Sequence, residues 1–287
     1  MRPDERPLVF SCDGASLVGV LHPADTDSGT GVVVVVGGPQ TRVGSHRQFL
    51  LLARALAENG IPVLRFDYRG IGDSEGEFSG FEDIEEDIRA AVDCLLAEHP
   101  GVKRVVLWGL CDAASASMMY ASGDERVAGM VLLNPWMRTE QGQSRTLMRS
   151  YYLRQVVSRQ FWSRLLRGDV RFRAALGSFG SNVKRALGIG DSTGDSKADK
   201  SYTDRMLAGF SAFDGAVELI LSGEDLTAAE FEQKVSQSKV WRRALNGPGV
   251  RTTKIAEATH TFSSAAWRAE VEALTLETIQ RVNERVL

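Results

Sequence analysis

The chain has 287 residues, of which 43% are hydrophobic and 25% charged, and its formal net charge is -3. This balance is typical of a globular protein with a sizeable core, and the slightly acidic chain does not favour nucleic acid as a partner. The N-terminal residues lack the apolar run of a signal peptide, and the longest apolar run, Val32–Val36, is too short to cross a bilayer. We therefore expect no transmembrane segment and a cytoplasmic protein.

The first element expected along the chain is a β-hairpin over residues 7–23, with Asp13 and Gly14 at its turn. Short β-branched runs then alternate with helical patterns, which predicts a mostly parallel sheet covered by helices on both faces, with the antiparallel hairpin at one edge. Strands are expected within residues 31–38, 62–70, 104–110, 127–136, 216–225 and 250–260. Helices are expected within residues 46–60, 81–100, 111–122, 228–245 and 264–287.

Residues 137–212 interrupt this alternation with helical patterns followed by a Gly/Ser/Asp-rich piece. We interpret them as a helical lid inserted between the two parts of an α/β core, residues 1–136 and 213–287. From Arg138 to Arg205 the chain carries fourteen Lys/Arg and six Asp/Glu, a net charge of +8. This charge fits a solvated helix face, or alternatively a surface for an anionic substrate, carrier or membrane.

The segment "WGLCDAASAS" joins an expected strand directly to an expected helix. This arrangement resembles the G-x-S-x-G nucleophile elbow of α/β hydrolases, with Cys111 in place of serine and Ala113 in place of the second glycine. The elbow would set the sulfur at the carboxyl end of the sheet and at a helix N-terminus, which favours a thiolate. The alternative is an ordinary buried cysteine, as expected for Cys12 and Cys94.

A thiol nucleophile needs a base, and only His260 among four histidines follows the last strand, where this fold places its base. The acid expected after the preceding strand is Asp225, with Glu224 as the alternative. A helix N-cap is the other role open to Asp225.

An oxyanion hole needs two backbone N–H groups, one from the residue after the nucleophile and one from the loop after the strand that contains Val32–Val36. The first is that of Asp112. In the loop, Pro39 has no N–H to donate, so the second donor is expected at Gln40, or at Gly38 if the register differs.

The segments "GGPQTRVGSHRQF", "GLCDAASA", "SGEDLTAAEF" and "HTFSSAAW" together resemble the exosortase A system-associated hydrolase 1 family. The resemblance implies the α/β-hydrolase fold, the triad Cys111, Asp225 and His260, and a place in bacterial exopolysaccharide and exosortase systems.

The favoured function is cleavage of an ester or thioester through an acyl-enzyme, on a small-molecule or carrier-bound acyl substrate. An acyltransferase with the same acyl-enzyme is the first alternative, and a non-catalytic binding protein with a degenerate hydrolase site is the second. No cofactor is expected. Neither a metal site nor a phosphate loop is expected, because the chain lacks the spacing of either.

Overall fold

A computed structural model of the chain describes residues 4–24, 29–38, 40–137 and 198–285. Met1–Met137 and Ser201–Leu287 form one compact unit, which contains the sheet and the helices that cover it.

The unit is built on an 8-stranded sheet with the strand order β1-β2-β4-β3-β5-β6-β7-β8. The first two strands form the expected hairpin, and β2 pairs antiparallel with β4; all later neighbours are parallel. Asp13 and Gly14 both have positive φ, 48° and 83°, which is the conformation of a two-residue hairpin turn. The strands are β1 (Arg6–Cys12), β2 (Ala15–His22), β3 (Thr30–Val35), β4 (Val63–Asp67), β5 (Arg104–Leu110), β6 (Val127–Leu133), β7 (Ala216–Glu224) and β8 (Val250–Thr259).

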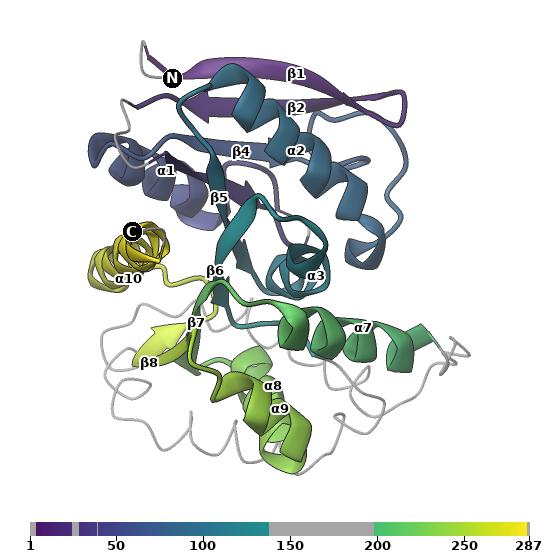
Figure 1. The fold of residues 1–287 in the computed structure, drawn as a ribbon, viewed down its shortest axis with the longest axis vertical. Coiled ribbons are helices and arrows are strands. Elements are labelled where there is room, and N and C mark those ends of the chain that lie inside the picture. The colour runs from purple at the N-terminus through teal and green to yellow at the C-terminus, as the bar shows by residue number, and fades with distance from the viewer. Residues whose placement is uncertain (1–3, 25–28, 39, 138–197, 286–287) are drawn as a thin grey trace, which may run out of the picture. The chain divides into compact units, whose positions relative to one another are not determined.

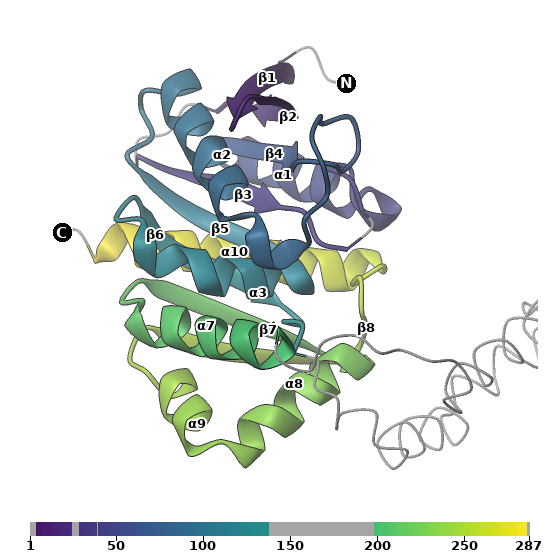
Figure 2. The same cartoon turned by 90° about the vertical axis from the view of Figure 1, so that its right-hand side faces the viewer.

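Helices cover both faces of the sheet, as its buried strands require (Figures 1 and 2). Helices α1 and α10 contact each other on one face, and α2 and α3 lie together on the other. The described helices of more than three residues are α1 (Gln48–Glu58), α2 (Glu85–Glu98), α3 (Asp112–Tyr120), α7 (Ala198–Ala212), α8 (Leu226–Gln237), α9 (Lys239–Leu245) and α10 (Ala265–Glu284).

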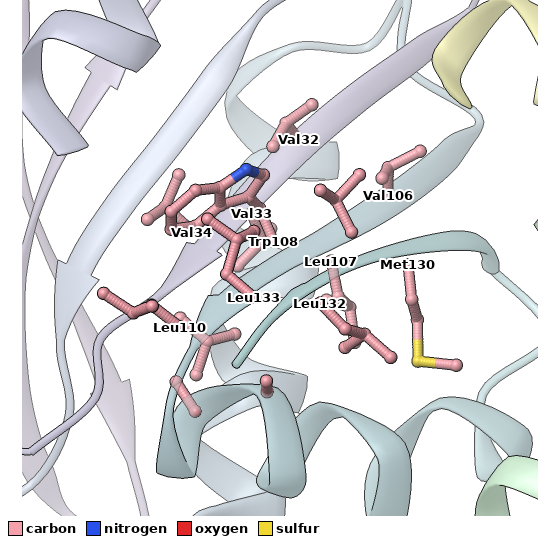
Figure 3. Close-up of a cluster of buried hydrophobic side chains, with 14 of the residues drawn as sticks. Val32, Val33, Val34, Val106, Leu107, Trp108, Leu110, Met130, Leu132 and Leu133 are labelled. Carbon is pink, nitrogen blue, oxygen red and sulfur yellow. The ribbon is translucent and has the colours of Figure 1, made fainter. Parts of the chain in front are cut away.

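A cluster of buried hydrophobic side chains lies on β3, β5 and β6, in the middle of the sheet (Figure 3). Val32, Val33 and Val34 are fully buried, as expected of a strand covered on both faces. Trp108 on β5 meets Phe49 of α1 edge to face, with ring centroids 5.6 Å apart. These contacts make the carboxyl ends of β3 and β5 a rigid support for the loops that follow them.

The helix expected over residues 228–245 is divided into α8 and α9. Ser238 between them has extended backbone, and its hydroxyl accepts the Trp241 N–H and caps α9. Serine competes in this way with helical hydrogen bonds, and the apolar pattern alone did not reveal the break. Ser264 caps α10 similarly through the Trp267 N–H, at the expected start of that helix.

Helix α7 is the last part of the segment expected to be the lid. From Ser201 onward it belongs to the unit that contains the sheet. Tyr202, Met206 and Phe210 of α7 are buried. A Cβ on Gly209 would lie 2.3 Å from the Met118 carbonyl oxygen, so α7 runs very close to α3. The basic helices expected within residues 138–197 lie outside the described residues, and the lid stays a prediction.

Trp241 joins three helices, because its ring packs on Phe210 of α7 and Phe231 of α8. It is 5% exposed, whereas its neighbour Val240 is 58% exposed. We expect Trp241→Ala to lower the free energy of unfolding by about 3–5 kcal/mol, because it leaves a large cavity. Val240→Ala is the matched control and should cost no more than about 0.5 kcal/mol. Urea unfolding of both variants measures the difference, and equal losses would contradict this packing role.

Candidate active site

Cys111 stands between β5 and α3 in a backbone conformation that few residues adopt. Its φ is 64° and its ψ is -124°, a region that costs a non-glycine residue of order 1–3 kcal/mol. The Cys111 N–H donates to the Leu133 carbonyl at 2.8 Å, and its carbonyl accepts the Trp136 N–H at 3.1 Å. The turn is therefore the sharp strand-to-helix elbow that the sequence predicts.

Small residues allow the elbow to close. A Cβ on Gly109 would lie 2.8 Å from the backbone of Ala113, so strand and helix approach to a distance that only glycine allows. Ala113 is fully buried at the position of the second glycine. Its methyl group is accommodated, and the substitution leaves the elbow intact.

The surroundings of Cys111 favour the neutral thiol. Burial, together with the negative charges of Asp112 and Asp225, raises the pKa of the Cys111 thiol to about 12, although the Asp112 N–H acts in the opposite direction. The position of Cys111 at a helix N-terminus predicts a thiolate. Burial of the sulfur and the two carboxylates outweigh this effect of the helix. A base must therefore remove the proton as the thiol reacts.

His260 and Asp225 lie together at the carboxyl ends of β7 and β8. The His260 Nδ1 atom is 2.9 Å from Asp225 Oδ2, and this carboxylate is nearly buried while the imidazole is about one-third exposed. The same Oδ2 accepts the Ala228 N–H at 3.1 Å, so Asp225 also caps α8. One side chain thus makes both of the contacts considered for Asp225, with His260 and with the start of α8. Glu224, the alternative acid, is an exposed residue at the end of β7.

A buried network that the sequence analysis missed fixes the strand ends under the histidine. The Asn134 side chain accepts the Ser222 N–H at 2.8 Å and donates to the Ser222 hydroxyl at 2.7 Å and to the His260 carbonyl at 3.2 Å. The Ser222 hydroxyl in turn donates to the Thr259 carbonyl. The sequence signal was a polar residue ending each of two apolar strands.

The loop after β3 reaches the elbow through Gly38. The Gly38 N–H donates to Asp112 Oδ1 at 2.7 Å, and the Ala113 N–H donates to the same oxygen at 2.9 Å. The Gln40 side chain turns instead toward its own loop, where it accepts the Ser45 N–H at 2.8 Å. The structure thus brings Gly38 and Asp112 together, and both N–H groups proposed for the loop stay candidates.

A second carboxylate, Asp67 at the end of β4, holds this loop in place. It accepts the Arg42 N–H at 2.6 Å and pairs with the Arg42 guanidinium, and it accepts the Asp73 N–H at 3.2 Å. A Cβ on Gly72 would lie 2.1 Å from Asp67 Oδ2, which explains the glycine there. The motif "FDYRGIGDSEG" therefore supports the loop after β3.

Sheet order, strand-to-helix elbow and a histidine–aspartate pair after the last strands define the α/β-hydrolase class. Residues 28–204 match the model of the Hydrolase_4 family, described as serine aminopeptidase, S33. The chain belongs to this family of hydrolases. Its own elbow carries Cys111 in place of the serine.

Among curated proteins, the chain is 32% identical over 127 residues to the polyketide transferase grgF of Penicillium sp, a stretch of 43% of this chain and 42% of that protein. The chain thus matches less than half of that relative's length.

Solved structures share the fold at low sequence identity. The Pyrococcus furiosus esterase Pf2001 has a TM-score of 0.64 at 16% identity, covering 96% of this chain and 90% of its own. The α/β hydrolase GrgF from Penicillium sp. sh18 has a TM-score of 0.63 at 19% identity, covering 98% and 99%. Est1E from Butyrivibrio proteoclasticus, solved with ferulic acid, has a TM-score of 0.61 at 15% identity, covering 96% and 99%.

Within the described ranges, no three His, Cys, Asp or Glu side chains are grouped as metal ligands. None of the helices that the structure describes is both long and apolar enough to cross a membrane.

Asp225→Ala removes both contacts of the carboxylate, whereas Asp225→Asn keeps an oxygen that can accept the Ala228 N–H and a His260 Nδ1–H and removes only the charge. We expect the alanine variant to lose about 1 kcal/mol more in unfolding free energy, because it lacks the cap. The ring signals of His260 should change most in the alanine variant, because Nδ1 loses its partner there. Urea unfolding and ¹⁵N NMR of the histidine ring measure the two effects. An unchanged His260 signal in both variants would show that the pairing is incidental.

Proposed function

We propose that the chain is a cysteine-dependent hydrolase that cleaves an ester or thioester through an acyl-enzyme on Cys111. The observation that carries the proposal is the 2.9 Å contact between His260 and Asp225, with a cysteine at the elbow of the same sheet edge. The triad is Cys111, His260 and Asp225.

In the first half-reaction, His260 takes the thiol proton as the sulfur of Cys111 attacks the acyl carbon. The carbonyl oxygen becomes an oxyanion, which the Asp112 N–H and a loop N–H from Gln40 or Gly38 stabilise. The intermediate collapses, the bond to the leaving group breaks, and His260 returns the proton to the departing alcohol or thiol. In the second half-reaction His260 takes a proton from water, whose oxygen attacks the acyl carbon. The C–S bond then breaks, the acid leaves, and His260 returns the proton to the sulfur of Cys111.

Asp225 supports the histidine in both steps. Its carboxylate accepts a hydrogen bond from the Nδ1–H group, which leaves Nε2 free to serve as the base. Its negative charge also stabilises the imidazolium that forms. Its second bond, from the N–H of Ala228, fixes the carboxylate on α8.

The cysteine favours activated acyl groups. Thiolates attack carbonyls readily and are good leaving groups. Transfer of an acyl group from a thioester to Cys111 therefore changes the free energy only slightly. Carrier-bound or small-molecule acyl thioesters and esters therefore fit the site. The predicted basic segment, with its net charge of +8 over Arg138–Arg205, would suit an anionic carrier or substrate.

The resemblance of four segments to the exosortase A system-associated hydrolase 1 family supports a finer assignment. We propose that the enzyme serves a bacterial exopolysaccharide or exosortase system. Its substrate would then be an acyl group used in that system.

Acyl transfer is the second candidate, and the similarity to a polyketide transferase favours it. It shares the first half-reaction, after which an alcohol or amine replaces water as the acceptor. The fate of the acyl-enzyme distinguishes the two reactions.

Intact-mass spectrometry after brief exposure to short and medium acyl thioesters at neutral pH tests the proposal. We expect one acyl adduct on the parent chain and none on Cys111→Ala, because the sulfur of Cys111 forms the new bond. His260→Ala should slow adduct formation by at least about 100-fold, the scale of a general base.

Cys94→Ala is the matched control, since Cys94 is also partly buried but lies on α2. It should form the adduct at the parent's rate. Decay of the adduct in water identifies a hydrolase, and decay that requires an added alcohol or amine identifies a transferase. Absence of both adduct and released acid would favour a non-catalytic binding protein.

A further inference from the structure

The carboxylate of Asp112 engages a backbone donor that an oxyanion could use. Its Oδ1 atom accepts the N–H of Gly38, from the loop after β3, and the N–H of Ala113, from the first turn of α3. An oxyanion hole takes one donor from the loop after β3 and one from the residue after the nucleophile, here Asp112 itself. In the resting site, an anion of the chain therefore binds Gly38, one of the two loop donors proposed for the oxyanion.

Close packing holds the carboxylate against the loop. A Cβ on Gly37 would lie 2.4 Å from Asp112 Oδ1, so the oxygen rests directly on the loop backbone. Gly38 has a φ of 59°, a left-handed conformation that accompanies the orientation of its N–H toward α3. The contact thus depends on two consecutive glycines.

A second group, Tyr68, offers the carboxylate another partner. Tyr68 is 1% exposed, and its hydroxyl makes no hydrogen bond to any residue that the structure describes. Burial raises the pKa of this phenol, and the negative charge of Asp112 raises it further, so the phenol lies within the field of that carboxylate. A buried donor without an acceptor is costly and calls for an explanation.

We propose that Asp112 is a positioning residue that exchanges partners during the reaction. In the resting enzyme its carboxylate holds the Gly38 N–H in place; when the acyl oxygen arrives, it takes over this donor and the carboxylate turns to the Tyr68 hydroxyl. This inference rests on the proposed function, because it assumes an oxyanion at Cys111.

The exchange also changes the charge beside the nucleophile. The titratable groups that face Cys111 and Asp112 among the described residues are Asp225, His260 and Tyr68. Asp112 and Asp225 both disfavour the thiolate, so neutralising Asp112 alone should make Cys111 more reactive.

NMR can observe the shared donor directly. Gly37–Gly38 is the one Gly-Gly pair in the sequence, so a chain labelled with ¹³C-carbonyl and ¹⁵N glycine gives a single HNCO signal, that of Gly38. In the wild-type chain this signal should shift as the pH falls through the pKa of Asp112, which burial raises. Asp112→Ala should displace the signal and abolish its pH dependence. If the Gly38 signal changes neither with pH nor in the Asp112→Ala variant, the resting contact is overturned.

A short-chain trifluoromethyl ketone tests the exchange. The sulfur of Cys111 adds to the ketone carbon, the carbonyl electron pair moves to oxygen, and the resulting hemithioketal mimics the oxyanion. We expect the adduct to move the Gly38 signal and to remove its dependence on Asp112 ionisation. Tyr68→Phe should weaken the adduct at least several-fold, because the displaced carboxylate loses its new partner. An adduct that leaves the Gly38 signal unchanged overturns the exchange alone.

Failure of the proposed function has a different signature. Absence of any adduct in the ¹⁹F spectrum overturns the nucleophile, and the exchange with it. The resting contact between Asp112 and Gly38 is then still judged by the pH titration.

Alkylation of Cys111 by iodoacetamide, read by peptide mass mapping apart from Cys12 and Cys94, tests the charge effect without an acyl substrate. Asp112→Asn keeps an acceptor for Gly38 but removes the charge, so we expect about tenfold faster alkylation at neutral pH, equivalent to about one pKa unit. Glu77→Gln, at an exposed position after β4, is the control for charge removal and should match the parent. An unchanged or slower rate in the asparagine variant would contradict the inference, and thermal melting of each variant confirms that it is folded.

Discussion

The strained backbone of Cys111 is the constraint on which the candidate site depends. A residue with φ of 64° and ψ of -124° persists only where its surroundings determine the conformation. Here the determinants are backbone bonds to the Leu133 carbonyl and from the Trp136 N–H, and the close approach of Gly109 to Ala113. Each belongs to β5, β6 or their following segments, and both strands are buried along most of their length. The core around Trp108 thereby fixes the direction of one partly buried sulfur atom.

The other members of the site are fixed by polar contacts at the same edge of the sheet. Asn134 joins the end of β6 to Ser222 on β7 and to the carbonyl of His260 after β8, and all of these atoms are buried or partly buried. Buried polar groups that satisfy one another specify a single arrangement, because a slip would leave donors unpaired. The backbone of the histidine is therefore held in place, and the carboxylate of Asp225 contacts its ring at Nδ1.

Much of this arrangement could be predicted from the sequence, because it follows from the order of the elements. The hairpin, the alternation of strands and helices, and the meeting of Asp225 with His260 all result from rules of topology and chain order. Side-chain contacts between distant segments could not be predicted. The bond from Gly38 to Asp112 joins residues 74 positions apart, and the break at Ser238 depends on one hydroxyl turning to its own backbone. The prediction that the helix favours a Cys111 thiolate was wrong for the same reason. The dipole of α3 could be inferred from the sequence, whereas the burial of Cys111 could not.

A raised thiol pKa is compatible with the chemistry proposed, provided that the proton and the charge are considered together. Moving a proton from Cys111 to His260 creates a thiolate and an imidazolium between two carboxylates. The carboxylates oppose the thiolate, but Asp225 is 2.9 Å from the imidazole, and His260 and Asp112 attract each other electrostatically, so both stabilise the imidazolium. Intrinsic nucleophilicity rises with the basicity of a thiolate, so each thiolate that forms during attack is a stronger nucleophile than a stable anion, although fewer thiolates are present at any time. Such a site keeps its cysteine neutral, and less prone to oxidation, until a carbonyl is placed against it.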